Sequence, residues 1–256
     1  MRSPKIIRFG RAICGDLHQA ERREWWLANG LGGYAAGTIA GSLTRRYHGL
    51  LIAPVEPPLG RRLVWAKADA ELVEGGASRP LFTNRWSGDT ISPAGYVHIE
   101  SFHLDGSIPV WLFAIGLTRI EARIWLEPGA NTSHVAWRLL AGPETRSRPA
   151  LLHVRLMVND RDHHGQTAVG EIDPQIDADD TELRVRQRNF VLRLRAYGGV
   201  ITRTLQWVEN FDLPVERQRG LLIATITCKW VKHGWNSSPA NGSESSAVWK
   251  GTHLSS

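Results

Sequence analysis

Residues 120–140 read IEARIWLEPGANTSHVAWRLL, and this stretch decides the fold class. Apolar residues alternate with polar ones on both sides of the central segment EPGANT, which is the pattern of strands with one buried face. Proline, glycine and asparagine in that segment are typical of a turn. The stretch therefore predicts two antiparallel strands, at 118–126 and 133–140, joined by a hairpin.

The same alternation recurs along most of the chain, and no long stretch shows the 3.6-residue spacing of an amphipathic helix. Further strands are expected at 47–53, 63–73, 96–104, 110–115, 151–158, 182–187, 190–196 and 202–208. LDGS at 104–107 predicts a tight hairpin, and GPETRSRP predicts a loop. More than nine short strands favour an all-β fold: a large antiparallel two-sheet β-sandwich with few short helices. In the strand at 151–158, Val154, Leu156 and Val158 should share one face, and His153, Arg155 and Met157 the other.

Bulk properties exclude several classes of protein. The 256 residues contain 42% hydrophobic side chains, without an apolar run long enough to span a membrane and without a signal peptide, so a cytoplasmic protein is expected. Two distant cysteines, Cys14 and Cys228, support neither a disulfide framework nor a metal site. The net charge of +6 is spread along putative strands, which disfavours a nucleic-acid interface. No cofactor and no metal are expected.

Residues 24–53 hold glycine-rich, aromatic and basic elements close together. NGLGGY, which begins at Asn29, permits a sharp turn beside Trp25 and Trp26. It lacks the lysine and serine of a phosphate-binding P-loop and the glycine spacing of a dinucleotide site. Most of the eleven tryptophans are expected in the core, although an indole can also stack on a sugar ring.

TRRYHGLL, at 44–51, places four polar side chains directly before an apolar strand: Arg45, Arg46, Tyr47 and His48. Guanidinium groups, a phenol and an imidazole can all contact carboxylates or sugar hydroxyls. The alternative is structural, with an arginine paired to an acidic residue of another domain and His48 partly buried. A domain interface and a sugar-facing rim are compatible, because ligand sites often lie between domains.

VNDRDHHG, which ends a predicted strand, is the other polar cluster. Asp160 and Asp162 could suggest catalytic carboxylates, and the adjacent His163 and His164 a metal site. A structural or interface role is favoured over sugar contact, and both over catalysis, because Asp and Arg commonly satisfy turn backbones at strand ends.

Six stretches of the chain resemble, in the expected order, the amino-terminal domain of bacterial and archaeal glycogen debranching enzymes. They are NGLGGYAAGT, TRRYHGLL, SFHLDGSIPVWLFAIG, IEARIWLEPGANTSHVAWRLL, VRLMVNDRDHHG and NFDLPVERQRGL. The resemblance spans roughly residues 20–220. It implies a β-supersandwich that precedes an (α/α)6 toroid, in an enzyme that hydrolyses α-1,6 branch points of glycogen or related α-glucans. It also implies that the toroid carries catalysis, so no catalytic residue is expected here and the chain alone should be inactive.

Ten residues are therefore candidates for substrate binding or for the interface with the helical domain. They are Trp25, Trp26, Asn29, Arg45, Arg46, Tyr47, His48, Arg161, Asp162 and His163. A stand-alone α-glucan-binding module without catalytic activity is the alternative function.

After Leu221 the sequence departs from the family pattern and becomes rich in serine. We expect residues 1–221 to form the β-sandwich domain. Residues 222–256 are expected to be an atypical, partly disordered tail, with disorder from about Asn236 onward. A truncated or frame-shifted reading would explain a chain that lacks the helical domain.

Overall fold

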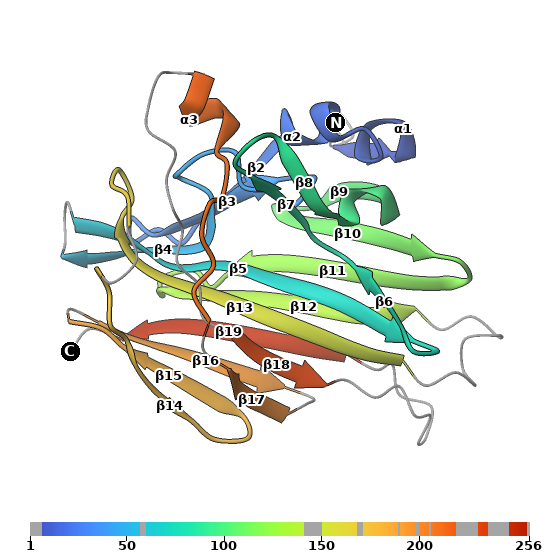
Figure 1. The fold of residues 1–256 in the computed structure, drawn as a ribbon. Coiled ribbons are helices and arrows are strands. Elements are labelled where there is room, and N and C mark those ends of the chain that lie inside the picture. Colours follow the sequence, from blue (N-terminus) through green and yellow to red (C-terminus); the bar gives the residue numbers. More distant parts are fainter. Residues whose placement is uncertain are drawn as a thin grey trace, which may run out of the picture.

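The computed structural model describes residues 7–56, 60–140, 150–167, 171–188, 190–197, 200–204, 206–218, 230–234 and 246–254. These residues form antiparallel sheets with a few short helices (Figure 1), which confirms the predicted all-β class. The short helices are α1 (Arg11–Cys14), α2 (Leu17–Glu21), α3 (Pro214–Gln218) and the 3-10 turn η1 (Gly95–His98). In the described part of the chain, no helix has the length and apolar character needed to cross a membrane.

A nine-stranded sheet forms one layer, in the order β1-β9-β10-β11-β12-β19-β16-β15-β14. Its strands are β1 (Arg8–Gly10), β9 (Ile99–Asp105), β10 (Ile108–Ile115), β11 (Thr118–Leu126), β12 (Thr132–Leu140), β14 (Gln175–Ala178), β15 (Glu182–Arg186), β16 (Val191–Tyr197) and β19 (Ser246–Leu254). The predicted hairpins at 104–107 and 127–131 join β9 to β10 and β11 to β12. The predicted loop at 142–149 lies outside the described residues.

A six-stranded sheet forms the other layer, in the order β13-β5-β4-β3-β2, with β6 also paired to β5. Its strands are β2 (Glu24–Ala28), β3 (Tyr34–Thr38), β4 (Gly49–Glu56), β5 (Gly60–Glu74), β6 (Ala77–Pro80) and β13 (Ala150–Asp162). Two separate ribbons pair β7 (Thr83–Trp86) with β8 (Thr90–Ala94), and β17 (Val200–Thr204) with β18 (Trp230–Gly234).

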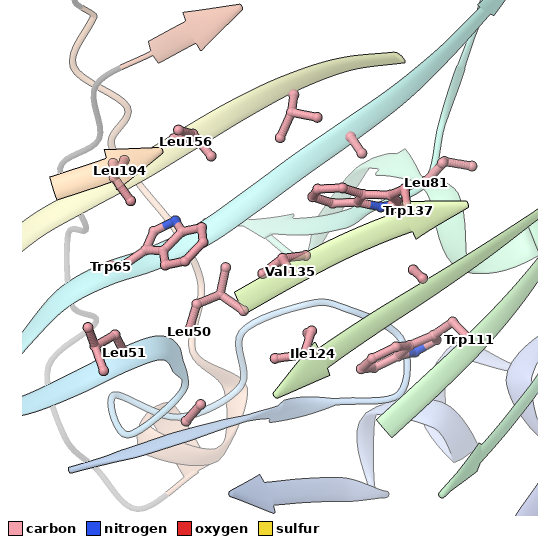
Figure 2. Packing of buried hydrophobic residues seen from close by; sticks show 14 of the residues in the cluster. Leu50, Leu51, Trp65, Leu81, Trp111, Ile124, Val135, Trp137, Leu156 and Leu194 are labelled. Carbon is pink, nitrogen blue, oxygen red and sulfur yellow. The ribbon is translucent and has the colours of Figure 1, made fainter. Parts of the chain in front are cut away.

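The core lies between the two sheets, where apolar side chains from both layers meet (Figure 2). Ile124 of β11 and Trp137 of β12 are buried there with Trp65 of β5. Buried and partly buried residues alternate along the whole of β11. The alternation in the sequence therefore reports the inner face of the sheet directly.

The faces predicted for β13 are confirmed for Val154, Leu156 and Val158, which are all buried. Met157 was expected on the opposite face, and it is buried as well. It belongs to a second apolar cluster with Phe211 and Leu213, so a distant segment covers that face of the six-stranded sheet.

The chain after residue 221 contributes two strands, β18 and β19. β19 pairs with β12 on one side and with β16 on the other. Residues 246–254 lie in the segment from about Asn236 onward for which disorder was expected, and they form β19 in the structure. Their backbone is ordered by tertiary pairing, which the serine-rich composition of the segment does not reveal. Cys228 lies outside the described residues, and Cys14 is a buried free thiol.

Candidate functional site: an aromatic–histidine cluster

The glycine-rich turn at 29–33 joins β2 to β3 and is held by the side chain of Asn29. Gly30 and Gly32 have φ values of 80° and 86°, which glycine adopts readily. The side-chain oxygen of Asn29 accepts hydrogen bonds of 2.9 Å from two backbone amides of the turn. Its Nδ2 donates to the carbonyl oxygen of Ala130 at 3.0 Å. Asn29 is buried, so these contacts give it a positioning role within the protein.

Trp25 and Trp26 are consecutive in β2 and therefore point to opposite faces of the sheet. Trp25 lies in the core, where its indole N–H donates to the carbonyl oxygen of Thr38 and its ring packs edge-on against Trp111. Trp26 is 51% exposed, and its ring stacks on Tyr34 with centroids 5.4 Å apart. Only the second tryptophan is thus placed to meet a ligand or a partner.

His48 is fully buried at the start of β4. Its Nδ1 accepts a hydrogen bond of 3.1 Å from the amide of Thr44, which leaves the ring proton of the neutral imidazole on Nε2. Nε2 lies 3.4 Å from Oε1 of Glu24. Burial lowers the pKa of His48, and Glu24 offsets this only in part. His48 is therefore neutral at neutral pH and orders the segment around it.

Glu24 also pairs with Arg45, whose Nε lies 2.5 Å from Oε1. Burial alone would raise the pKa of this carboxyl, but hydrogen bonds from His48 and Arg45 outweigh it and lower the pKa to about 2. Glu24 is thus ionised and, from β2, holds two of the predicted contact residues, Arg45 and His48. The polar groups of Arg45 and His48 therefore form their contacts inside this domain.

Arg46 connects the same segment to α3. Its backbone amide donates to Oε1 of Glu216 at 3.2 Å, and its Nε lies 3.6 Å from Oε2. Glu216 is itself buried. The guanidinium also donates to the carbonyl oxygen of His164 at 2.5 Å. Arg46 therefore joins three segments that are distant in the sequence.

Arg161 lies near the end of β13 and is only 1% exposed. Its Nη1 donates to the carbonyl oxygens of Asp162 and Gly165, at 3.2 and 3.1 Å, and its Nη2 donates to that of Arg46 at 2.6 Å. Burial, followed by the nearby charge of Arg46, lowers the pKa of Arg161 to about 10, so it stays charged at neutral pH. This one side chain fastens the turn after β13 to the segment before β4.

The turn at 162–165 presents two histidines beside two tyrosines. Oδ1 of Asp162 accepts a hydrogen bond of 2.8 Å from the amide of His164, which fixes the turn. Nδ1 of His163 lies 3.2 Å from the hydroxyl of Tyr34, and Nδ1 of His164 lies 3.0 Å from that of Tyr47. The two imidazole rings are 3.9 Å apart. We call Trp26, Tyr34, Tyr47, His163 and His164 the aromatic–histidine cluster.

The inner part of the aromatic–histidine cluster is uncharged at neutral pH. Burial raises the pKa of Tyr34 to about 12, so its hydroxyl keeps its proton. Burial, helped by His164, lowers the pKa of His163, whose Nδ1 can then accept that proton in a hydrogen bond. Trp26 and His164 are exposed at the outer side. Flat rings with hydroxyl and imidazole groups between them suit a neutral polar ligand or the surface of a partner domain.

The two carboxylates of VNDRDHHG are already engaged. Asp160 pairs with Arg62, which also donates to the carbonyl oxygen of Asp160 at 2.9 Å. Asp162 orders the turn, as described above. Across the described residues, no group of three or more His, Cys, Asp or Glu side chains is placed to hold a metal ion. The local geometry thus gives both aspartates structural contacts.

Sequence reasoning grouped most of these side chains, but its ten candidates leave out four residues that complete the arrangement, among them His164, which it considered only as part of a possible metal site. Tyr34 and His164 belong to the aromatic–histidine cluster. Glu24 holds Arg45 and His48, and Glu216 holds Arg46, in the segment beside it. Tyr34 is the last residue of the motif NGLGGY, and His164 directly follows the candidate His163, so motif analysis could have included both. The two glutamates act through tertiary contacts and carry no signal of their own.

Comparison with known proteins identifies the relatives of this chain. A family described as glycogen debranching enzyme N terminal matches residues 23–224. A search of curated protein sequences gave no match. Among solved structures, a polysaccharide lyase aligns at 13% identity and a TM-score of 0.38, covering 76% of this chain and 26% of the lyase. A bacterial glucoamylase complexed with acarbose aligns at 12% identity and a TM-score of 0.38, covering 97% of this chain and 36% of the glucoamylase. The chain spans about a quarter to a third of the length of these two structures.

Proposed function

Because the chain belongs to the glycogen debranching enzyme N-terminal family, we propose that it is the non-catalytic β-sandwich domain of an enzyme that hydrolyses α-1,6 branch points of glycogen or related α-glucans. The match over residues 23–224 carries the proposal. The parent enzyme is then a glycoside hydrolase, an amylo-α-1,6-glucosidase, and the cytoplasm is its proposed location.

In this proposal the hydrolytic carboxylates belong to an (α/α)6 helical domain. Glycoside hydrolysis uses a carboxylic acid and a second carboxylate on either side of the scissile bond. Asp160 and Asp162, the candidates of the conspicuous polar motif, are held by Arg62 and by a backbone amide. These contacts of Asp160 and Asp162 support a non-catalytic role for the sandwich, with the catalytic groups in the helical domain.

The aromatic–histidine cluster is the proposed contact surface. Arg161 and Arg46 hold its turn and its loop at fixed positions from inside. Trp26 and His164 are left exposed on this rigid support. Such a preorganised rim can pack against the helical domain and line the glucan cleft at the same time, because ligand sites commonly lie where domains meet.

Association with a helical domain tests this role. We would titrate the chain with a separately expressed helical domain of a debranching enzyme and measure the dissociation constant by calorimetry. Trp26→Ala should weaken binding at least tenfold, because it removes the exposed ring of the rim. Leu117→Ala, at a residue that is 67% exposed in another hairpin, is the matched control and should leave the constant unchanged. Equal constants for both variants would remove the aromatic–histidine cluster from the interface.

A stand-alone α-glucan-binding module is the second candidate function. The observation that favours it is the exposed Trp26 ring, which stacks on Tyr34 and offers a flat apolar surface without any partner domain. Retardation of the isolated chain in a native gel that contains glycogen, abolished by Trp26→Ala, would support this module.

A further inference from the structure

The outward face of the nine-stranded sheet carries a hollow of about 330 Å³ above β11 and β12. Glu121, Arg123 and Trp125 line it from β11, and Ala136 and Arg138 from β12. Strand pairing sets Arg123 opposite Ala136, and Glu121 opposite Arg138. The small side chain of Ala136 lies among four larger ones, so the sequence itself creates the depression. We call it the outer hollow.

Trp125 forms one wall of the outer hollow and is held by its cross-strand neighbour. His134 lies directly opposite it in the pairing of β11 with β12. The two rings stack with centroids 4.7 Å apart and planes within 1° of each other. Since both residues are only partly buried, the indole is a supported aromatic surface at the solvent boundary.

Among the described residues, the two arginines that line the outer hollow both contact carboxylates. Arg123 contacts Asp105 and Glu121, each at 2.9 Å, and Arg138 contacts Glu121 at 3.0 Å. Two guanidinium groups thus face two carboxylates. A charged ligand would have to displace one of these partners, whereas hydroxyl groups can accept from the guanidinium groups and donate to the carboxylates without disturbing the balance. The electrostatics therefore favour a neutral ligand rich in hydroxyls.

We propose that the outer hollow binds a segment of a neutral sugar chain, with Trp125 against an apolar ring face and with Glu121 and Arg138 at the hydroxyls. The volume lies at the lower end of the range of roughly 300–1,000 Å³ for ligand pockets. The hollow and the turn of Asn29 share the β11–β12 hairpin, because the amide of Gly129 donates to the carbonyl oxygen of Asn29 at 2.8 Å. Only the choice of an α-linked glucan rests on the proposed function.

Calorimetric titration of the full chain with maltoheptaose tests the proposal. Trp125→Ala should raise the dissociation constant at least tenfold because the stacking surface is lost. Ala136→Met should do the same by filling the hollow, although it removes no contact group. Leu117→Ala should bind as the unchanged chain does, and circular dichroism should show that all variants stay folded.

Several results would overturn this inference. It fails if the unchanged chain binds no maltoheptaose and no cellohexaose, or if both hollow variants bind as well as Leu117→Ala. It also fails if Trp26→Ala alone abolishes binding, because the glucan would then lie at the aromatic–histidine cluster and the proposed function would survive. Competition by inorganic phosphate at millimolar concentration would mark an anion site instead. Binding of cellohexaose in preference to maltoheptaose would keep the sugar site and contradict the α-glucan.

Discussion

Single residues of the site show clearly how far sequence reasoning reaches. The motif TRRYHGLL was predicted to gather polar contacts, and the structure does bring Arg46 and Tyr47 together with the turn at 162–165. The pairing of Arg45 and His48 with Glu24 could not be predicted, because it depends on the positions of β2 and β4 on either side of β3. Long-range partners decide which polar residue is structural and which faces outward.

Arg161 should be a main determinant of stability at the site. Arg161→Lys keeps the charge but cannot donate to several carbonyl oxygens at once, so buried acceptors lose their partners. We expect the free energy of unfolding to fall by about 3 kcal/mol in urea titrations. Arg186→Lys is the control, since Arg186 forms an exposed pair with Asp177 and should change stability by less than about 0.5 kcal/mol. Similar losses for both variants would refute the fastening role.

Glu24 should make the domain sensitive to acid. Its pKa is lowered to about 2 in the folded state, so its contribution is complete above the unfolded pKa near 4.5 and is lost as the pH falls toward 2. Because Glu24 is only partly buried, solvent screening reduces this contribution to about 1–2 kcal/mol. Glu24→Gln should therefore flatten the dependence of the unfolding free energy on pH between 5 and 2. An unchanged slope in this variant would show that other carboxylates dominate acid unfolding.

At the scale of elements, alternation and turn residues predicted the long strands and missed the short or composition-biased ones. β11 begins and ends where the sequence indicated, because Ile120, Ala122, Ile124 and Leu126 alternate along it and face the core. β2 and β3 were hidden, since a glycine-rich stretch reads as a loop until β4 supplies the partner for β3. β19 was hidden for the same reason: its hydrogen bonds to β12 and β16 are invisible in a serine-rich sequence.

The central position of β19 can be tested with proline. Val248→Pro removes a backbone donor and introduces a rigid ring within a strand that is paired on both sides. We expect a loss of about 3 kcal/mol or more in chemical unfolding. Asp177→Pro, in the edge strand β14, is the control and should cost clearly less. If Val248→Pro is the milder change, β19 does not complete the nine-stranded sheet.

At the scale of the whole molecule, two sheets enclose the core and leave two surfaces with sugar-compatible chemistry. The aromatic–histidine cluster is built from β2, β3, the segment before β4 and the turn after β13, all belonging to the six-stranded sheet or its connections. The outer hollow lies on the outward face of the nine-stranded sheet. The β11–β12 hairpin links them through its contacts with Asn29. The two-sheet arrangement and the family were predictable from sequence, because both depend on ordered local patterns. The outer hollow was not, because it depends on which side chains the register sets opposite Ala136.

Release of glucose from a branched α-limit dextrin tests the central claim most directly. The measurement compares this chain alone, a debranching-enzyme helical domain alone, and the two together. We predict no release by the chain alone, and release by the pair that exceeds release by the helical domain alone at least tenfold. Hydrolysis of branch points by the chain alone, or a helical domain whose rate the chain does not change, would contradict the assignment of this domain as a non-catalytic partner.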